Sequence, residues 1–356
     1  MNSEILEEEK RIISEKWVAN IVSAYGCTKN NSIISPSGDD IRDRLWDLAS
    51  VTKIYSLFVI LSLHENGLFD ITKKIKEYSN NYTGLSELYV YELLNFSVEL
   101  STSSRIDACK SYDEAVDLLH SVQIKSNTTK YSDIGIMVVV QLINDIYHSD
   151  LYFRNYTYEI LRKIGALNTC WWKDIDSKNT NIENYDSEYR YIDNKIIEIN
   201  TPLGMSHDSK ARVIPYTGHA GLFSSAKDVA VFANALLSGG IISKRTIELV
   251  LSNKFDSWDT THHYGLLCNK KHPDIKYSEI PISCSENSIA ISGYTGTYLL
   301  LDFDNSSYIF IGANRIHNRI TNLSHDKSTD IYPCTKDYVF RKDTLRDMIA
   351  LELLRS

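Results

Sequence analysis

The sequence has little of what marks several large classes of protein. Its six cysteines are scattered, and no pair has the Cys-x-x-Cys spacing of a zinc site or the clustering of a disulfide framework. No apolar run reaches the length of about 18 residues that a membrane-spanning helix needs. The chain also lacks clusters of lysine and arginine. These absences argue against a zinc module, a disulfide-rich secreted domain and a transmembrane protein.

Acidic residues outnumber basic ones by 46 to 38, so the formal net charge is −8. An acidic chain is a poor partner for nucleic acid or an anionic membrane, because both carry negative charge. The stretch from Met1 to Glu9 is acidic and lacks the basic and then apolar build of a secretory signal. We therefore expect a cytoplasmic protein with free thiols, with neither nucleic acid nor a membrane as partner.

What the chain does have is apolar residues, 43% of 356, which is enough for one large core. Period-two apolar patterns predict strands towards both ends, and helical periodicity dominates between them. Strands are expected at about 17–25, 32–35, 298–302 and 308–313, and helices at about 4–15, 50–66, 225–237 and 336–354. The stretch 179–191, rich in tyrosine and asparagine, is expected to be irregular.

This order of elements predicts an α/β (α+β) fold in a single domain, 1–356. A sheet subdomain of about 1–70 and 217–356 takes its strands from both termini and is flanked by helices. A mainly helical subdomain covers about 71–216. Clefts form where two such lobes meet, so we expect the functional site between them.

The most informative local pattern is Ser50-Val51-Thr52-Lys53, at the head of a strongly apolar run. Residues three apart share a helix face, so the hydroxyl of Ser50 and the amine of Lys53 are able to touch. Main-chain amides at a helix N-terminus favour the negative charge that develops when a serine attacks a carbonyl. The alternative is a surface lysine in the first turn. The following run is apolar on every side, however, and a buried lysine needs a partner or a task.

Other segments follow in a fixed order along the chain. They are 45–53, 93–97, Tyr131-Ser132-Asp133-Ile134-Gly135, 219–226, 263–266 and 293–302. Together they resemble the serine beta-lactamase and penicillin-binding-protein superfamily, specifically its class C-like branch of esterases, D-aminopeptidases and acyltransferases. The resemblance covers nearly the whole chain and implies a beta-lactamase/transpeptidase-like fold with an antiparallel sheet.

The resemblance implies an acyl-enzyme mechanism with a small-molecule acyl substrate. Ser50 is the expected nucleophile, and Lys53 and Tyr131 are expected to share the general-base work. The main-chain amides of Ser50 and Tyr294 are expected to form the oxyanion hole, beside Ser292 and Gly293 in the third motif. No cofactor is implied.

A phenol with a pKa of about 10 is a poor base at pH 7. A lysine cation about 4 Å away contributes roughly 4 kcal/mol at an effective dielectric of 20. That energy corresponds to about three pKa units, which would bring Tyr131 into working range. Asp133 complicates this expectation, because a carboxylate beside Lys53 holds the amine charged and opposes formation of the tyrosinate.

Two positions depart from the pattern that the chain resembles. Asp133 stands where the second motif usually has asparagine. Ile291 stands where the third motif usually has lysine or histidine, so the group that would bind a substrate carboxylate is missing. Arg315 and His317, at the end of the following strand, either replace that cation or cap the strand end in solvent.

Metal chemistry has little support in the sequence. The pairs His207-Asp208 and His262-His263 lack the helical spacing with a carboxylate partner that a zinc site uses. The former is expected to order the loop before His219. The chain also contains no Gly-x-Ser-x-Gly elbow and no phosphate- or dinucleotide-binding glycine pattern. No metal is therefore expected.

Three functions remain open on these residues. The first is a serine hydrolase of the esterase, amidase or peptidase kind, with beta-lactam hydrolysis disfavoured by Ile291. The second is an acyltransferase that passes the same acyl group to an alcohol or amine. The third is a silent binding protein with this fold, against which the joint presence of Ser50, Lys53 and Tyr131 argues.

Overall fold

The computed structural model describes residues 2–15, 17–28, 30–176, 178–179, 181–183, 188–192, 195–316, 319–322, 330–331 and 342–355. Its helices are α1 Asn2–Ser14, α2 Thr52–Glu65, α3 Val90–Leu94, α4 Tyr112–His120, α5 Ile134–Ile146, α6 Tyr152–Ile164, α7 Ser209–Val213, α8 Ala226–Leu237, α9 Lys244–Leu251 and α10 Lys342–Leu353. Its strands are β1 Ile21–Cys27, β2 Asn30–Ile34, β3 Trp46–Asp47, β4 Glu99–Ser101, β5 Gln123–Ser126, β6 Cys170–Trp171, β7 Glu188–Ile192, β8 Lys195–Ile199, β9 Leu222–Ser224, β10 Ser257–Trp258, β11 His263–Tyr264, β12 Asn269–Lys270, β13 Ser288–Ser292, β14 Tyr298–Asp302, β15 Ser307–Ala313, β16 Arg319–Asn322 and β17 Asp330–Ile331.

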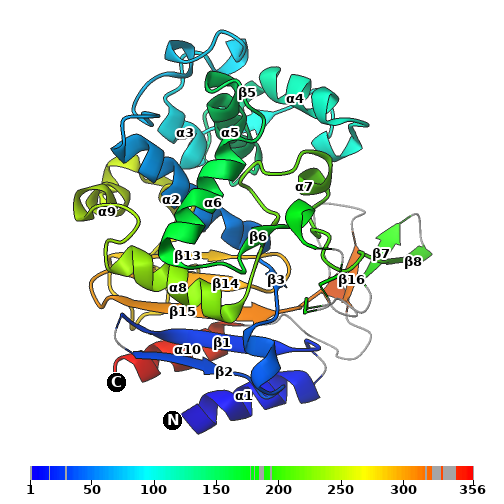
Figure 1. The fold of residues 1–356 in the computed structure, drawn as a ribbon, viewed down its shortest axis with the longest axis vertical. Helices are drawn as coiled ribbons and strands as arrows, with labels where there is room; N and C mark the ends of the chain where they lie inside the picture. Colours follow the sequence, from blue (N-terminus) through cyan, green and yellow to red (C-terminus); the bar gives the residue numbers. More distant parts are fainter. Residues whose placement is uncertain are drawn as a thin grey trace.

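The main sheet has eight strands in the order β10-β11-β12-β13-β14-β15-β1-β2, and each neighbouring pair is antiparallel. Strand β1 from the N-terminal part pairs with β15 from the C-terminal part, with Val22 opposite Gly312. The prediction of an antiparallel sheet built from both ends of the chain is confirmed (Figure 1).

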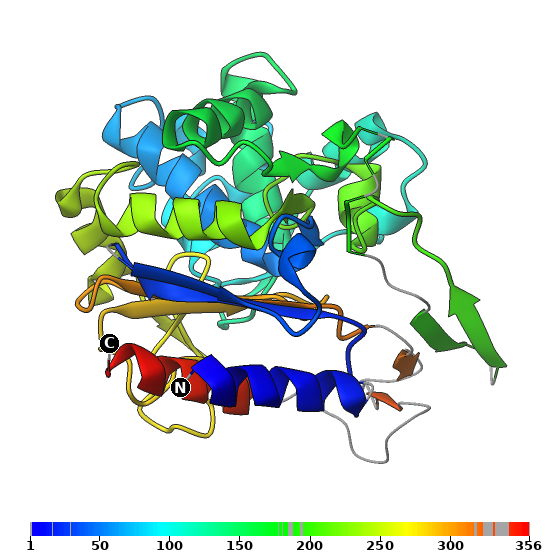
Figure 2. The same ribbon diagram turned by 60° about the horizontal axis from the view of Figure 1, so that its bottom comes forward.

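Two layers of helices cover the two faces of this sheet. Helices α1 and α10 lie side by side against one face, and the larger helical part lies against the other (Figure 2). Alternate residues of β15 explain this arrangement: Ile309 and Ile311 face the core under α1 and α10, whereas Phe310 faces the core of α2, α5 and α8. Successive residues of a strand point to opposite faces of the sheet, so a sheet covered by helices on both faces needs apolar residues at both sets of positions.

Several predicted boundaries shift, each for a local reason. Strand β1 begins at Ile21 rather than near Trp17, because the amides of Ala19 and Asn20 donate to the side-chain oxygen of Asn314 at 3.1 and 3.2 Å. Helix α10 begins at residue 342, and the predicted start near 336 lies outside the described residues.

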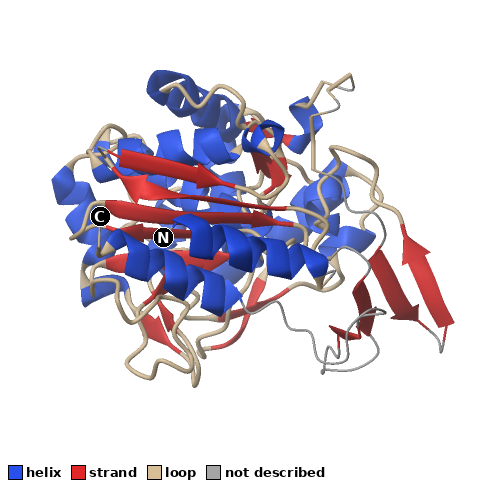
Figure 3. Ribbon diagram, turned by 90° about the horizontal axis from the view of Figure 1, so that it is seen from below, coloured by secondary structure: helices blue, strands red, loops and turns tan. Residues whose placement is uncertain are grey.

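The predicted irregular stretch 179–191 is wrong at its end, because β7 begins at residue 188 and pairs with β8 in a hairpin. The far strand, Lys195–Ile199, contains three isoleucines, and β-branched residues of this kind favour strands. The hairpin lies beside β16 at one end of the molecule, seen from below in Figure 3. Its first residue, Glu188, contacts His207, which in turn stacks on Tyr294 of the site described below.

Helix α2 passes through the core and presents the site at its N-terminus. Its residues from Thr52 to Leu63 are all buried, as the apolar run predicts. A short 3-10 turn over Ala49–Val51 precedes it and contacts the end of β13. Within the described ranges, no helix combines the length and apolar character that crossing a bilayer demands.

Candidate active site

Ser50 lies in a tight turn that the surrounding chain holds in a strained shape. The preceding residue, Ala49, has a φ of +44°, a region that residues with a Cβ rarely adopt. The buried carboxylate of Asp47 accepts the Ala49 amide at 2.9 Å and the His207 amide at 2.7 Å. These bonds fix the turn, so Ser50 lies in the 3-10 turn directly before α2 and not within the helix.

Lys53 is completely buried, and each of its three donors has an acceptor. Its Nζ lies 3.0 Å from Ser50 Oγ, 3.0 Å from the main-chain oxygen of His219 and 2.7 Å from a carboxylate oxygen of Asp133. An ammonium group supplies three hydrogen-bond donors, so this geometry suits the charged form.

Tyr131 reaches the same serine from the helical part. Its hydroxyl donates to Ser50 Oγ at 2.9 Å, and its ring packs on Phe96 with centroids 4.9 Å apart. The chain turns into α5 directly after it, and a Cβ on Gly135 would meet the oxygen of Leu93 at 2.2 Å, so only glycine fits there. The predicted convergence of the hydroxyl, the amine and the phenol is confirmed.

The end of β13 closes the other side of Ser50. Two threonines of the following turn hold the chain before the serine: Thr295 donates to the oxygen of Asp47 at 2.8 Å and Thr297 to that of Leu48 at 2.9 Å. Gly293 lies against that chain, and a Cβ there would lie 2.7 Å from the Leu48 oxygen and 2.1 Å from Thr297 Oγ1. The close approach explains the glycine.

Gly293→Ala is expected to destabilise the protein by about 2–3 kcal/mol, as overpacking a rigid contact does. The added methyl group has to push the main chain before Ser50 away, so kcat is expected to fall by about tenfold or more with it. Urea unfolding and turnover of an activated ester measure the two effects.

Gly38→Ala is the matched control for this change. A Cβ at Gly38 meets nothing within 4 Å, although the φ of +93° is unfavourable for alanine. It is expected to cost about 1 kcal/mol of stability and to leave kcat unchanged. Equal losses of kcat in both variants would contradict a specific role for the contact between Gly293 and Leu48.

The ionisation of the three groups follows from their neighbours. Burial alone would lower the pKa of Lys53, but Asp133 raises it overall, so the amine stays charged. Burial would raise the pKa of Asp133, but Lys53, His219 and Lys210 lower it overall. The expectation that Lys53 brings Tyr131 into working range as a base is wrong in direction. Its pKa is raised, because burial of the phenol, together with Asp133, outweighs the effect of Lys53.

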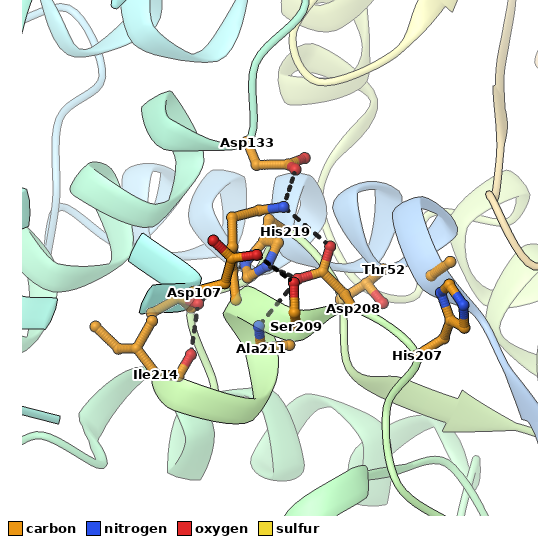
Figure 4. Close-up of polar contacts among 12 residues, drawn as sticks. Thr52, Asp107, Asp133, His207, Asp208, Ser209, Ala211, Ile214 and His219 are labelled. Carbon is orange, nitrogen blue, oxygen red and sulfur yellow. Dashed lines mark hydrogen bonds and ion pairs between the residues drawn. The ribbon is translucent and has the colours of Figure 1, made fainter. Parts of the chain in front are cut away.

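A second layer of charge, which the sequence did not reveal, lies behind this pair. Lys210 Nζ lies 3.1 Å from Asp133 and 3.2 Å from Asp208, and His219 Nε2 lies 3.1 Å from Asp208. Asp208 also caps α7 through the amide of Ala211 at 3.0 Å, so it orders this loop as predicted. Figure 4 shows Asp133, Asp208 and His219 gathered at this point.

Lys210→Met is expected to destabilise the protein at pH 7 by about 2 kcal/mol, between the values typical of exposed and of buried ion pairs. The pKa values of Asp133 and Asp208 are lowered in the folded state, so the stability that their pairs contribute is complete above the unfolded pKa of about 3.9 and is lost only as the pH falls from there through the lowered folded values. The difference between wild type and variant should therefore stay constant down to about pH 4 and shrink only in more acidic solution. Urea unfolding from about pH 7 to about pH 2 measures it.

Lys227→Met is the control, because Lys227 forms an exposed pair with Asp43 at 2.6 Å. It is expected to cost less than about 0.5 kcal/mol at either pH. A pH-independent loss in Lys210→Met would show that packing of its aliphatic chain, rather than its charge, stabilises the loop.

A cavity of 400 Å³ opens at Ser50. Its lining residues are Ser50, Tyr131, His262, Tyr264, Asn269, Glu279, Ile291, Ser292, Gly293, Tyr294 and Arg315. Every predicted residue of the third motif is therefore at the cavity, and Arg315 is there as well, whereas His317 lies outside the described residues. Glu279, His262, Tyr264 and Asn269 were not predicted as site residues. Tyr264 lies in the segment 263–266 and His262 in a pair weighed for metal binding, whereas no motif in the sequence pointed to Glu279 or Asn269.

The histidines that suggested metal binding each have another partner. His207 contacts Glu188 at 2.6 Å and stacks on Tyr294, and His262 contacts Asp259 at 3.1 Å. Across the part of the chain that the structure describes, no three His, Cys, Asp or Glu side chains gather to hold a metal ion.

A family model described as Beta-lactamase matches residues 35–323. The N-acetylmuramyl-L-alanine amidase of Bacillus subtilis (strain 168) is 27% identical over 308 residues, which are 78% of this chain and 69% of the amidase. A class C beta lactamase from Rhodobacter sphaeroides has a TM-score of 0.67 at 13% identity and covers 100% of this chain and 99% of its own. EstCE1, a hydrolase with promiscuous acyltransferase activity, has a TM-score of 0.69 at 14% identity and covers 88% of this chain and 93% of its own. These two structures are similar to the chain in fold.

Proposed function

The chain belongs to the beta-lactamase family, and from that membership we propose that it is a serine hydrolase which forms an acyl-enzyme on Ser50. The beta-lactamase/transpeptidase-like fold expected from its motifs is confirmed. The observation that carries the proposal is local. Ser50 Oγ lies within hydrogen-bond distance of both Lys53 Nζ, at 3.0 Å, and Tyr131 Oη, at 2.9 Å.

The proposed reaction runs through the neutral phenol. Ser50 Oγ attacks the carbonyl carbon and gives its proton to Tyr131 Oη, while the phenol gives its own proton to the leaving atom, so no free tyrosinate is needed. Lys53 stays charged and stabilises the negative charge that develops on both oxygens. The raised pKa of Tyr131 supports this relay rather than a resting tyrosinate base.

The remaining steps use the main chain and water. The amides of Ser50 and Tyr294 would hold the oxyanion, since both residues line the cavity and each follows closely on a partner in the contact between Leu48 and Gly293. In the second half-reaction, water attacks the acyl-enzyme, and its proton passes through Tyr131 back to Ser50 Oγ. An alcohol or amine in place of that water would make the same site an acyltransferase.

Hydrolysis of esters or amides is favoured over that of beta-lactams. Ile291 lines the cavity and is only 2% exposed, so it offers an apolar surface at the position where the third motif usually supplies a cation. Arg315 lies elsewhere in the cavity, against the ring of Tyr294, and does not occupy that position. The cytoplasmic location and the absence of nucleic-acid and membrane partners stay predictions from the sequence.

Intact-mass measurement after exposure to a fluorophosphonate tests the proposal, with Ser50→Ala as the control. One adduct on the wild type and none on the variant is the expected result. No adduct on the wild type would contradict the proposal and favour the silent binding protein. A parallel exposure to a penicillin should give no adduct, and a penicilloyl mass would show that Ile291 does not exclude beta-lactams.

A further inference from the structure

Glu279 places a negative charge on the wall of the cavity that contains Ser50. Its side chain is half-buried, and one carboxylate oxygen accepts a hydrogen bond from Ser292 Oγ at the end of β13. Within the described ranges of the chain, no lysine, arginine or histidine nitrogen lies within 4 Å of this carboxylate. Among the residues that the structure describes, this carboxylate therefore has no ion-pair partner.

The position of Glu279 is fixed by its main chain. Its carbonyl oxygen accepts hydrogen bonds from Tyr298 Oη at 2.8 Å and from Arg346 Nη1 at 2.8 Å. Both sequence neighbours, Ser278 and Ile280, are buried. The main chain is thus fixed and the bond from Ser292 orders the carboxylate, so little ordering cost has to be met on binding.

Arg315 brings the opposite charge to another part of the same cavity. Its guanidinium lies 5.4 Å from the ring of Tyr294, and its Nε is buried without a hydrogen-bond partner. It forms no ion pair with Glu279, because no such contact within 4 Å exists between these two described residues. A ligand that fills the cavity therefore meets a carboxylate that still lacks its cation.

We propose that Glu279 determines specificity by binding a protonated amine of the substrate. This inference rests on the proposed function and names its substrate class, an ester or amide that carries an ammonium group on either side of the scissile bond. An ammonium group offers three donors, and the carboxylate oxygen that Ser292 leaves open accepts one of them. Charge-assisted bonds of this kind are about twice as strong as neutral ones.

The test compares binding of pentylammonium with that of pentanol by calorimetry at low salt, on wild type, Glu279→Gln and Glu286→Gln. The glutamine keeps an acceptor for Ser292 and removes only the charge. Glu286 has a side chain that is 82% exposed, lies outside this cavity and pairs with Lys271, so its variant controls for a general loss of negative charge. Thermal unfolding of each variant checks that it is folded.

We expect wild type and Glu286→Gln to bind pentylammonium at least about tenfold more tightly than pentanol, and Glu279→Gln to bind the two within about twofold. An ammonium preference that is absent from the wild type, or that survives in Glu279→Gln, would overturn the inference. The same titration on Ser50→Ala separates the two proposals. If Ser50→Ala still prefers pentylammonium, amine binding by Glu279 is supported even if the wild type forms no adduct at Ser50. If the wild type forms the adduct but shows no preference for pentylammonium, the serine hydrolase is supported and the amine-binding role of Glu279 is rejected.

Discussion

Lys53→Met is expected to lower kcat on an activated ester by about 10³- to 10⁵-fold, the range lost when a proton-transfer and charge-stabilising group is removed. The ammonium is within 3.0 Å of Ser50 Oγ and is the cation nearest to the charge that develops there. It also holds the pKa of Tyr131 below the value that burial and Asp133 would otherwise set. Steady-state turnover and the rate of fluorophosphonate labelling measure the loss.

The same substitution is expected to destabilise the fold by about 2–3 kcal/mol. Removing one partner of a buried ion pair typically costs more stability than this. The Asp133 side chain, however, is 23% exposed and still pairs with Lys210 at 3.1 Å. Adding Asp133→Asn to Lys53→Met should recover about 1–2 kcal/mol, since the uncompensated charge is then gone. The double variant should remain inactive, because the ammonium is still missing.

Lys270→Met is the matched control for this prediction. Lys270 is 4% exposed and pairs with Asp256 at 2.8 Å, so its loss removes an equally buried ion pair away from Ser50. A similar loss of stability with retained kcat is expected. If both lysine variants lost activity in proportion to their stability, the role assigned to Lys53 in the reaction would have to be abandoned.

The contrast between Lys53 and Lys210 shows how far the sequence alone reaches. The approach of Lys53 to Ser50 is local, because three residues on a helix return to the same face, and burial follows from the apolar run around it. Lys210 meets Asp133 across 77 positions of chain, and no periodicity or spacing encodes that contact. Its signal was indirect, in the polar pair His207-Asp208 that was expected only to order a loop.

Strand positions show the same division. Strand β14 was predicted with both ends correct, because its apolar residues face two cores and the turn after it is marked by Asp304 and Asn305. Strand β1 was placed four residues too early, since the bond from Ala19 to Asn314 depends on a residue at the other end of the chain. Local patterns located the elements, and contacts distant in sequence decided where they end.

Electrostatic balance was the least accessible property. The attraction between Lys53 and the tyrosinate was correctly included, but the cost of burying the phenol has no counterpart in a sequence and proved larger. Glu279 is a similar case, because an acidic residue in a polar loop has no motif. Only the folded structure places it on the cavity wall, in contact with Ser292.

Tyr131→Phe is expected to lower kcat/KM by about 10³-fold on alkyl esters and by about tenfold or less on a p-nitrophenyl ester. A neutral phenol that relays a proton matters most when the leaving atom has to be protonated, and p-nitrophenolate leaves without a proton. The substitution removes only the hydroxyl that donates to Ser50 at 2.9 Å. The ring keeps its contact with Phe96, so unfolding should shift by less than about 1 kcal/mol.

A series of esters whose leaving groups differ in pKa measures this difference. The readout is the slope of log kcat/KM plotted against the pKa of the leaving group. The slope should be shallow for the wild type, which protonates the leaving atom, and steep for Tyr131→Phe. Because the pKa of Tyr131 is raised, the phenol should stay protonated between about pH 6 and pH 8, and the wild-type rate should be constant over that range. Parallel slopes in the two proteins, together with a rate that climbs through neutral pH, would instead identify Tyr131 as a tyrosinate base. The effect of Lys53 in lowering the pKa of Tyr131 would then have to exceed the combined effect of burial and Asp133 in raising it.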